Sequence, residues 1–436
     1  MRRSAIEFLH EWKNRKGRKP LVIKGARQVG KTWLMKSFGS NSFENIAYIN
    51  FESQVNLQSL FLEDFNLSRI MRAIAIASGV NPVAGKTLII FDEIQAAERG
   101  VTVLKYFCEE LPEFHVIAAG SLLGISLHKN TSFPVGKVEF LQLHPLSFTE
   151  FLHALSEQQL LELLNEKDWK LIAVFKNRFI ERLKQYYFVG GMPEVVQAFS
   201  ETNDYAQIRA IQLNILQSYE NDFSKHAPYG IVPRIRMIWN NIPSQLAKEN
   251  KKFIYGLLKE GSRAKEYESA LLWLEDAGLV HKIYNITQAA IPLKSYESHK
   301  SFKLFVFDVG LLSAMNKIDH SVLLESNRFF KEFKGALTEQ FVLQQLVIHT
   351  SLQINYWSSE RSEGEVDFVI QNSQTIIPIE VKAEENLKAK SLKVFCDKYN
   401  VKGIRVSMSD FRAESWMKNV PLYALDLLAT DARNSL

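Results

Sequence analysis

The segment Gly25 to Thr32 constrains this chain more than any other. Its sequence, Gly-Ala-Arg-Gln-Val-Gly-Lys-Thr, matches the phosphate-loop pattern G-x-x-x-x-G-K-[ST] at every fixed position. An apolar run over residues 21–23 precedes it, and residues 33–38 can open a helix after it. This order of strand, loop and helix predicts a turn that presents backbone N–H groups to phosphate at the start of a helix.

The residue types in this loop have a chemical reason. Gly25 and Gly30 allow the backbone to approach phosphate oxygens without a Cβ atom in the way. Lys31 is expected to reach the β- and γ-phosphates, and the Thr32 hydroxyl to bind Mg²⁺. A glycine-containing turn that binds nothing would leave the Lys-Thr pair without explanation.

A second motif, Thr87 to Glu93, is a short apolar strand that ends in two carboxylates. Asp92 is expected to hold Mg²⁺, and Glu93 to polarise the attacking water. An acidic pair after a core strand is common in α/β proteins, but after a phosphate loop it indicates nucleotide hydrolysis. The residues expected to bind ATP are Gly25, Ala26, Arg27, Gln28, Val29, Gly30, Lys31, Thr32, Trp33 and Asp92.

A third apolar strand, residues 115–120, is followed by Ser121. A small polar residue at this point can face the γ-phosphate and orient the water beside it. The expected catalytic residues are therefore Lys31, Glu93 and Ser121, with Thr32 and Asp92 as the metal ligands.

Five motifs in order resemble one family, the bacterial and archaeal AAA-type ATPases that carry a C-terminal domain of unknown function. The motifs are the phosphate loop, Ile-Ile-Phe-Asp-Glu-Ile-Gln (89–95), Ala-Gly-Ser-Leu-Leu (119–123), Leu-His-Pro-Leu-Ser-Phe-Thr-Glu-Phe-Leu (143–152) and Val-Gly-Gly-Met-Pro-Glu-Val-Val (189–196). One departure is Gly136-Lys137, where the resemblance implies Gly-Arg. Because lysine cannot make the planar bidentate contact of arginine, a finger-like role at Lys137 is not expected.

Length and composition place the chain among multidomain globular proteins. Its 436 residues exceed one ordinary core and predict two to four domains. No window approaches 18 apolar residues without a charge, so no membrane contact is expected. Cys108 and Cys396 are too few for a disulfide framework or a metal site, which favours a cytoplasmic protein with reduced thiols.

The expected fold class is α/β, with four domains. Residues 1–155 alternate strand and helix patterns and read as an AAA-type P-loop core with a parallel sheet. Residues 156–225 are predicted to be a helical lid, and Gly190-Gly191 with Pro193 break its helices. A winged-helix domain over 226–325 and a small α/β domain resembling restriction endonucleases over 326–436 are expected to follow.

The winged-helix prediction depends on an amphipathic helix over 262–278 and an alternating strand over 279–285. An earlier helix is expected to start at residues 242–247. Segment 225–305 has 13 Lys and Arg against seven Asp and Glu, an excess typical of nucleic-acid contacts and also of solvated helix faces. The basic residues expected to meet DNA are Arg263, Lys265 and Lys282. Packing or protein docking remains the alternative, since four carboxylates on the same helix would repel phosphate: Glu266, Glu268, Glu275 and Asp276.

The last hundred residues carry a second acidic constellation. Glu339 lies in a helical stretch, Asp367 in a strand, and Glu380 and Lys382 on one face of the next strand. A loop over 357–363 is expected to lead into the Asp367 strand. The order resembles the nuclease core of restriction endonucleases, in which the carboxylates bind Mg²⁺ and the lysine orients water. A scaffold without activity, or an ordinary Glu–Lys pair, remains open.

Two kinds of function follow from these patterns. The first is a Mg²⁺-dependent ATPase that acts as a motor or switch on a nucleic-acid-binding or nuclease-like C-terminal half. The alternative is a nucleotide-dependent interaction protein whose C-terminal half docks a protein partner, or a second copy, and cuts nothing. Phosphoryl transfer to a small molecule is disfavoured by the Asp92-Glu93 pair.

Overall fold

The chain folds into two compact units, each described here by itself. Residues 2–144 with 276–279 form the N-terminal unit, and residues 145–275 with 280–436 form the C-terminal unit. The computed structural model describes residues 2–120, 134–248, 252–261, 263–324, 331–350, 352–359, 364–384 and 389–427. Within these ranges, no helix is both long enough and apolar enough to cross a lipid bilayer.

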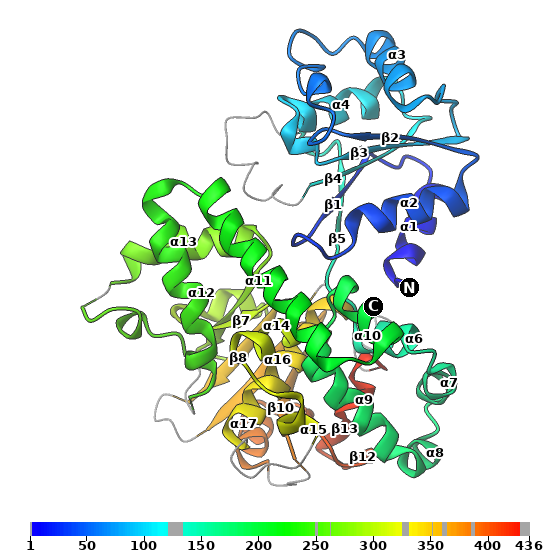
Figure 1. Cartoon of the computed structure of the whole chain (residues 1–436). Coiled ribbons are helices and arrows are strands. Elements are labelled where there is room, and N and C mark those ends of the chain that lie inside the picture. The colour runs from blue at the N-terminus through cyan, green and yellow to red at the C-terminus, as the bar shows by residue number, and fades with distance from the viewer. Residues whose placement is uncertain are drawn as a thin grey trace. The chain divides into compact units, whose positions relative to one another are not determined.

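The N-terminal unit alternates short strands with helices (Figure 1). Its elements are α1 (Ala5–Asn14), β1 (Leu21–Lys24), α2 (Lys31–Ser42), β2 (Asn45–Asn50), α3 (Leu67–Ser78), β3 (Thr87–Asp92), α4 (Gly100–Glu110), β4 (His115–Ala119) and β5 (Glu139–Gln142). The apolar runs over residues 21–23, 87–93 and 115–120 predict β1, β3 and β4. They do not predict β5, because its residues alternate between half-buried and exposed positions and form no continuous apolar run.

The five strands form one parallel sheet in the order β2-β3-β4-β1-β5. Since β4 lies between β1 and β3, the carboxyl ends of these three strands meet at one edge of the sheet. The phosphate loop follows β1, and Asp92 is the last residue of β3. The strand order thus brings together two motifs that are far apart in the sequence.

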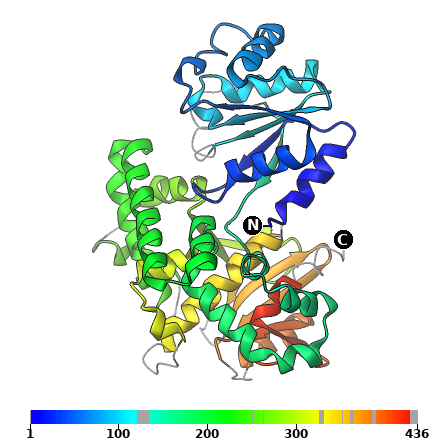
Figure 2. The same ribbon diagram turned by 45° about the vertical axis from the view of Figure 1, so that its right-hand side comes forward.

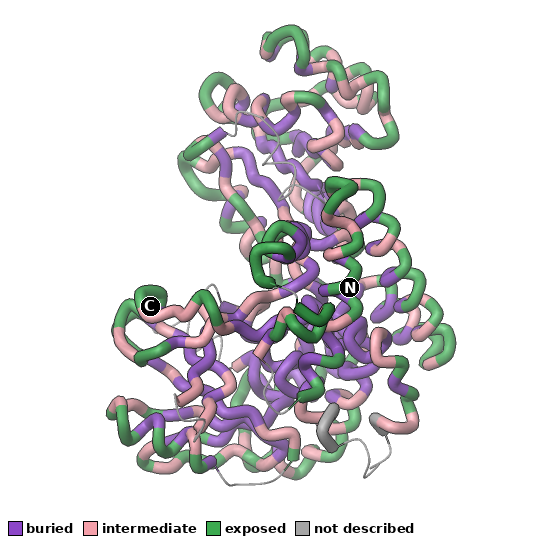
Figure 3. Tube along the Cα trace, turned by 90° about the vertical axis from the view of Figure 1, so that its left-hand side faces the viewer, coloured by how far each residue is buried: buried purple, intermediate pink, exposed green. Residues whose placement is uncertain are grey.

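Helices cover both faces of this sheet (Figure 1). Side chains alternate along each strand, and one set, including Ile49 and Phe91, packs with buried residues of α3 and α4. The other face meets α2, where Gly39 lies directly against Ile46 and Leu88. Strands β1, β3 and β4 are buried almost throughout, and buried residues are drawn in purple in Figure 3.

The C-terminal unit begins with helices and continues into a sheet flanked by further helices (Figures 1 and 2). Its helices are α6 (Phe148–Ala154), α7 (Gln158–Glu166), α8 (Trp169–Val174), α9 (Lys176–Val189), α10 (Pro193–Thr202), α11 (Tyr205–His226), α12 (Val232–Leu246), α13 (Ala264–Asp276), α14 (Val309–Met315), α15 (His320–Leu324), α16 (Lys331–His349) and α17 (Lys390–Tyr399). Its strands are β6 (Val280–Ile286), β7 (Glu297–Val306), β8 (Ile354–Ser358), β9 (Glu365–Asn372), β10 (Thr375–Val381), β11 (Gly403–Ser407), β12 (Arg412–Ala413) and β13 (Met417–Pro421).

All eight strands belong to one mixed sheet in the order β12-β13-β11-β10-β9-β8-β6-β7. The strand expected over 279–285 is present as β6, which pairs antiparallel with β7 at one edge of the sheet and parallel with β8. The boundary expected between residues 325 and 326 therefore falls between strands of a single sheet. The helices expected to form a lid, α7 to α11, also lie in this C-terminal unit.

In this part of the chain the elements follow in the order α16-β8-β9-β10-α17-β11. The two helices, α16 and α17, pack on opposite faces of these strands. Leu392 and Phe395 of α17 pack with Trp357 and Val366. Glu365 precedes Val366 and points to the opposite face, where it pairs with Lys303, and α16 contacts the neighbouring strand β10.

Two local predictions in this unit are wrong. Residues 242–247 do not start a helix but end one, since α12 runs to Leu246 with Pro243 in its last turn. Trp357 does not open a loop, because it lies inside β8, where its ring is buried. The helix expected over 262–278 is present as α13, and Gly278 follows it with φ +71°.

Candidate functional site

The phosphate loop has a backbone that requires glycine. Gly25 has φ +147° and Gly30 has φ +93°, both in regions that L side chains rarely adopt. A Cβ atom at Gly25 would lie 2.2 Å from the carbonyl oxygen of Leu143. Helix α2 begins at Lys31 directly after the loop, so the positive end of its dipole faces any bound anion.

Lys31 is buried within this loop, at 6% exposure. Its ammonium group donates to the carbonyl oxygens of Gly25 at 2.9 Å and Ala26 at 2.8 Å. Burial lowers the pKa of Lys31 to about 8, although the nearby carboxylates of Glu93 and Asp92 act to raise it. A phosphate group near this nitrogen would favour the charged form.

Asp92 is the centre of a hydrogen-bond group at the end of β3. Its Oδ2 atom accepts from the Thr32 hydroxyl at 2.7 Å and from the Tyr48 hydroxyl at 2.9 Å, and its Oδ1 atom accepts from the backbone N–H of Glu93 at 3.1 Å. Burial, together with the charge of Asp92, raises the pKa of Tyr48 to about 12. Tyr48 therefore stays protonated and acts as a donor to Asp92.

Glu93 stands at the corner where the chain leaves the sheet. Its φ of +49° is uncommon for a residue other than glycine, and such positions cluster at functional sites. Gln95 donates from Nε2 to one Glu93 carboxylate oxygen at 2.5 Å. The general base expected from the sequence is thus held beside the buried Asp92.

The remaining residues expected to bind nucleotide surround this centre. Ala26 and Val29 are buried in the loop, Gln28 is exposed, Arg27 is half-buried, and Trp33 is 45% exposed on the first turn of α2. Ser121 lies outside the described residues. Lys137 pairs with Glu109 at 2.9 Å on the protein surface.

Arg3 is a residue of this site that the motifs do not predict. Its guanidinium group donates to the carbonyl oxygen of Val29 in the phosphate loop at 3.0 Å and to that of His144 at 2.6 Å. The side chain is buried, and it precedes α1 in the sequence. Arg3 thus fixes the phosphate loop through the main-chain carbonyl group of Val29.

These residues fit an Mg²⁺-bound nucleoside triphosphate. The loop backbone is open to close approach, the Lys31 ammonium is bonded to main-chain carbonyls of the loop, and a hydroxyl and a carboxylate are already paired at Thr32 and Asp92. Oxygen donors of this kind are the ligands that Mg²⁺ prefers.

A second group of charged residues lies in the C-terminal unit and is called the lysine–carboxylate cluster below. Asp367 and Glu380 come from the neighbouring strands β9 and β10, and both carboxylates act to raise the pKa of Lys382. The Lys382 ammonium lies 2.7 Å from Oε1 of Glu380, and Asp367 accepts the backbone N–H of Val381 at 2.7 Å. The full cluster is Lys303, Glu339, Glu365, Asp367, Glu380 and Lys382.

Lys303 and Glu365 are members of this cluster that the sequence patterns do not indicate. Lys303 comes from β7, is 1% exposed, and forms an ion pair with Glu365. Its Nζ atom lies 3.7 Å from Oε2 of Glu339 and 4.9 Å from the centroid of the Tyr356 ring. The one sequence feature that could indicate a buried charge at Lys303 is its position as the single charged residue in the apolar run Phe-Lys-Leu-Phe-Val.

The charges in the cluster act on one another. Burial acts to lower the pKa of Lys303. The charges of Glu339, Glu365 and Asp367 act to raise it by a larger amount, so the pKa is shifted upward overall. Burial also raises the pKa of Glu380, against the opposing effect of Lys382. In the described part of the chain, no three acidic, histidine or cysteine side chains are arranged to hold a metal ion.

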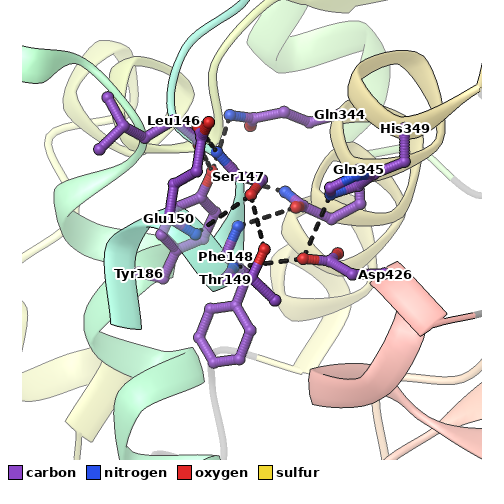
Figure 4. A network of polar contacts seen from close by, with 10 residues as sticks. All are labelled: Leu146, Ser147, Phe148, Thr149, Glu150, Tyr186, Gln344, Gln345, His349 and Asp426. Carbon is purple, nitrogen blue, oxygen red and sulfur yellow. Dashed lines mark hydrogen bonds and ion pairs between the residues drawn. The ribbon is translucent and has the colours of Figure 1, made fainter. Parts of the chain in front are cut away.

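The motif over residues 143–152 contributes to a buried polar network (Figure 4). Ser147 and Glu150 form a capping box at the start of α6. The backbone N–H of Phe148 donates to Gln345 of α16 at 2.9 Å, and that of Thr149 donates to Asp426 at 3.2 Å. This part of the motif therefore joins α6 to α16 and to the end of the described chain.

The motif over residues 189–196 packs against the same network. The Gly191 N–H donates to Asp308 at 2.7 Å, and the Gly191 carbonyl accepts the N–H of Leu146. Gln344 of α16 donates to both Asp308 and the Tyr186 hydroxyl. Within the C-terminal unit, these contacts give both motifs a structural role.

Two of the three basic residues expected to contact DNA are exposed, and the third is half-buried. Arg263 and Lys265 are exposed near the start of α13, as are Glu266 and Glu268. Lys282 of β6 is half-buried, and its ammonium lies 4.6 Å from the ring centroid of Phe302. Two exposed basic residues are therefore followed by two exposed acidic residues at the start of α13.

Three family models match this chain. Residues 17–152 match an AAA domain, and residues 180–322 and 334–425 match two domains of unknown function, DUF8612 and DUF4143. A search of curated proteins found no match.

Several solved structures are similar over much of the chain. A Walker-type ATPase of Pyrococcus abyssi is 15% identical and has a TM-score of 0.44, with 72% of this chain and 95% of that chain covered. The Orc1 protein of Aeropyrum pernix in complex with DNA is 11% identical, with 72% and 90% covered and a TM-score of 0.26. AMPPCP-bound DnaA from Aquifex aeolicus is 17% identical, with 62% and 75% covered and a TM-score of 0.27.

The AAA domain match covers the phosphate loop, the Asp92-Glu93 pair and every strand of the five-stranded sheet. The N-terminal unit is thus an AAA-type P-loop domain.

Proposed function

We propose that this protein binds ATP with Mg²⁺, hydrolyses it, and uses the turnover to switch the state of its C-terminal unit. The observation that carries the proposal is the hydrogen bond from Thr32 to Asp92, with Glu93 as the next residue. This bond joins the phosphate loop to the strand end that holds the general base. An ordinary αβ turn has no need of such an arrangement.

Each residue of the site has a role in this proposal. The loop N–H groups and the start of α2 bind the phosphate oxygens, and Lys31 exchanges its carbonyl partners for the β- and γ-phosphates. Thr32 and Asp92 hold the metal ion, which when bound neutralises charge on the phosphates. Glu93 takes a proton from the attacking water, and Gln95 holds its carboxylate in place.

A second candidate function is a nucleotide-dependent interaction protein without nuclease activity. It is favoured by the lysine–carboxylate cluster, in which two carboxylates that a nuclease would use for metal lie next to lysines: Glu339 is 3.7 Å from Lys303, and Glu380 pairs with Lys382. It is also favoured by the acidic residues among the exposed basic residues of α13, since these would repel phosphate. In this second candidate, ATP controls docking of a protein partner.

Calorimetry of ATP binding tests the nucleotide site. Lys31→Ala is expected to abolish detectable binding, because it removes the buried cation from the loop. Lys86→Ala is the matched control, since Lys86 is an exposed lysine at the other end of β3. Unchanged ATP affinity in Lys31→Ala would reject the assignment.

Phosphate release with and without nucleic acid separates the two candidate functions. Single-stranded DNA, duplex DNA and RNA are added in separate reactions at low salt. Stimulation that weakens steeply as salt increases supports a nucleic-acid switch, because phosphate contacts release counterions. No effect of any of the three supports the interaction protein.

A further inference from the structure

The lysine–carboxylate cluster contains its own cations. It brings four carboxylates, from α16, β9 and β10, together with two ammonium groups on one face of the sheet. The resemblance to nucleases implies that a divalent metal ion balances these carboxylates. The contacts in the cluster do not fit that expectation.

We propose that Lys303 is a built-in counter-cation that holds the carboxylates of Glu339 and Glu365 in place of a divalent metal ion. Its ammonium forms an ion pair with Glu365 and lies 3.7 Å from Glu339. It thereby links the strand β9 to the helix α16. In nuclease-like proteins the same link between helix and strand would be made by the metal.

The surroundings of Lys303 keep the ammonium in this place. Its neighbours in β7, Phe302 and Leu304, are buried, and the lysine itself is 1% exposed. The ring of Tyr356 lies 4.9 Å from Nζ, and the hydroxyl of that ring is fixed by Ser301 at 2.9 Å. Lys303 therefore cannot turn to solvent without opening the edge of the sheet.

A metal ion held by Glu339 would compete with the Lys303 ammonium, which lies 3.7 Å from Oε2 of that residue. Two cations in one buried site repel strongly because the interior screens charge poorly. Lys382 further engages Oε1 of Glu380 at 2.7 Å, whereas Oε2 of Glu380 is buried and has no hydrogen-bond partner in the described part of the chain. Removing the Lys303 charge is therefore expected to leave oxygens that can accept a divalent ion.

The first test uses the full chain without nucleotide and needs no destabilising variant. Binding of Mn²⁺ is followed by electron paramagnetic resonance in the wild type, in Asp367→Asn and in Asp92→Asn. The proposal predicts equal Mn²⁺ binding by the wild type and Asp367→Asn. A Mn²⁺ site that Asp367→Asn removes and Asp92→Asn retains would overturn the proposal.

The second test removes the cation. Lys303→Met is expected to lower the Tm by about 10 °C in EDTA, because it leaves buried carboxylates without their partner. Lys300→Met, an exposed lysine on the same strand, is the control and is expected to change Tm little. A Lys303→Met protein as stable as the control would overturn the proposal.

A rescue experiment distinguishes charge balance from packing. Added Mn²⁺, or the second substitution Glu365→Gln, is expected to restore at least half of the Tm lost in Lys303→Met. Restoration by either one supports a counter-cation, since both remove the charge imbalance without restoring the lysine stem. If neither restores the Tm, Lys303 acts through packing and the proposal fails.

Discussion

The Thr32 hydroxyl donates to Oδ2 of Asp92 over 2.7 Å, which links the start of α2 to the end of β3. The same Asp92 oxygen accepts from Tyr48, a residue of the adjacent strand β2. Two elements, α2 and β2, thus fix the carboxylate at the end of β3. The orientation of Asp92 is set by hydrogen bonds within the protein, which is the preorganisation that a metal-dependent site requires.

Tyr48 is expected to tune the affinity for Mg²⁺. Tyr48→Phe removes one hydrogen bond to a charged acceptor and should raise the Mg²⁺ concentration for half-maximal ATP turnover about tenfold. ATP binding without Mg²⁺ should stay unchanged. Tyr106→Phe, in α4 of the same unit, is the control; equal Mg²⁺ dependence in both variants would show that Tyr48 does not position Asp92.

The lowered pKa of Lys31 predicts that ATP binding depends on pH. Below a pH of about 8, Lys31 is already protonated in the free protein, so affinity should be nearly constant. Above that pH, the free protein loses the proton and ATP binding must take one up, because phosphate raises the pKa of Lys31. Affinity should therefore fall as pH rises through 8.

Calorimetry in buffers of different ionisation enthalpy measures this proton uptake. About one proton per ATP is expected well above pH 8, and close to none from Lys31 at pH 7. Binding that takes up no proton at pH 9 would mean that burial does not lower the pKa of Lys31.

Gly191 is expected to be essential to the fold of the C-terminal unit. A Cβ atom at this position would lie 2.2 Å from the carbonyl oxygen of Leu146. Gly191→Ala should therefore reduce the free energy of unfolding by about 3 kcal/mol. Gly230→Ala is the matched control, because no heavy atom lies within 4 Å of its Cβ position. Chemical denaturation of both variants measures the difference, and equal stability would contradict the described packing.

The sequence predicts the N-terminal unit well because its signals are local. The phosphate loop is a continuous segment whose residue types follow from close approach to phosphate, and the strand before Asp92 is a continuous apolar run. Strand β5 carries no such run. Arg3 is not predicted because its two partners, Val29 and His144, are carbonyl oxygens that any residue could supply.

The C-terminal unit is harder to predict because its pairings are distant. The strand predicted over 279–285 is expected to belong to a separate winged-helix domain, whereas β6 pairs with β8 as well as with β7. Lys303 and its partner Glu365 are 62 residues apart, so no spacing rule connects them. The proximity of Glu380 and Lys382 could be predicted from the sequence, because residues two apart on a strand point to the same face.

The measurement that tests the central proposal most directly is phosphate release by Glu93→Gln. The wild type is expected to release phosphate from ATP only with Mg²⁺. Glu93→Gln should bind ATP–Mg²⁺ as tightly as the wild type and release phosphate about 100-fold more slowly, because it loses the general base. Wild-type protein that binds ATP–Mg²⁺ without hydrolysing it, or a Glu93→Gln variant that hydrolyses at the wild-type rate, would contradict the proposal.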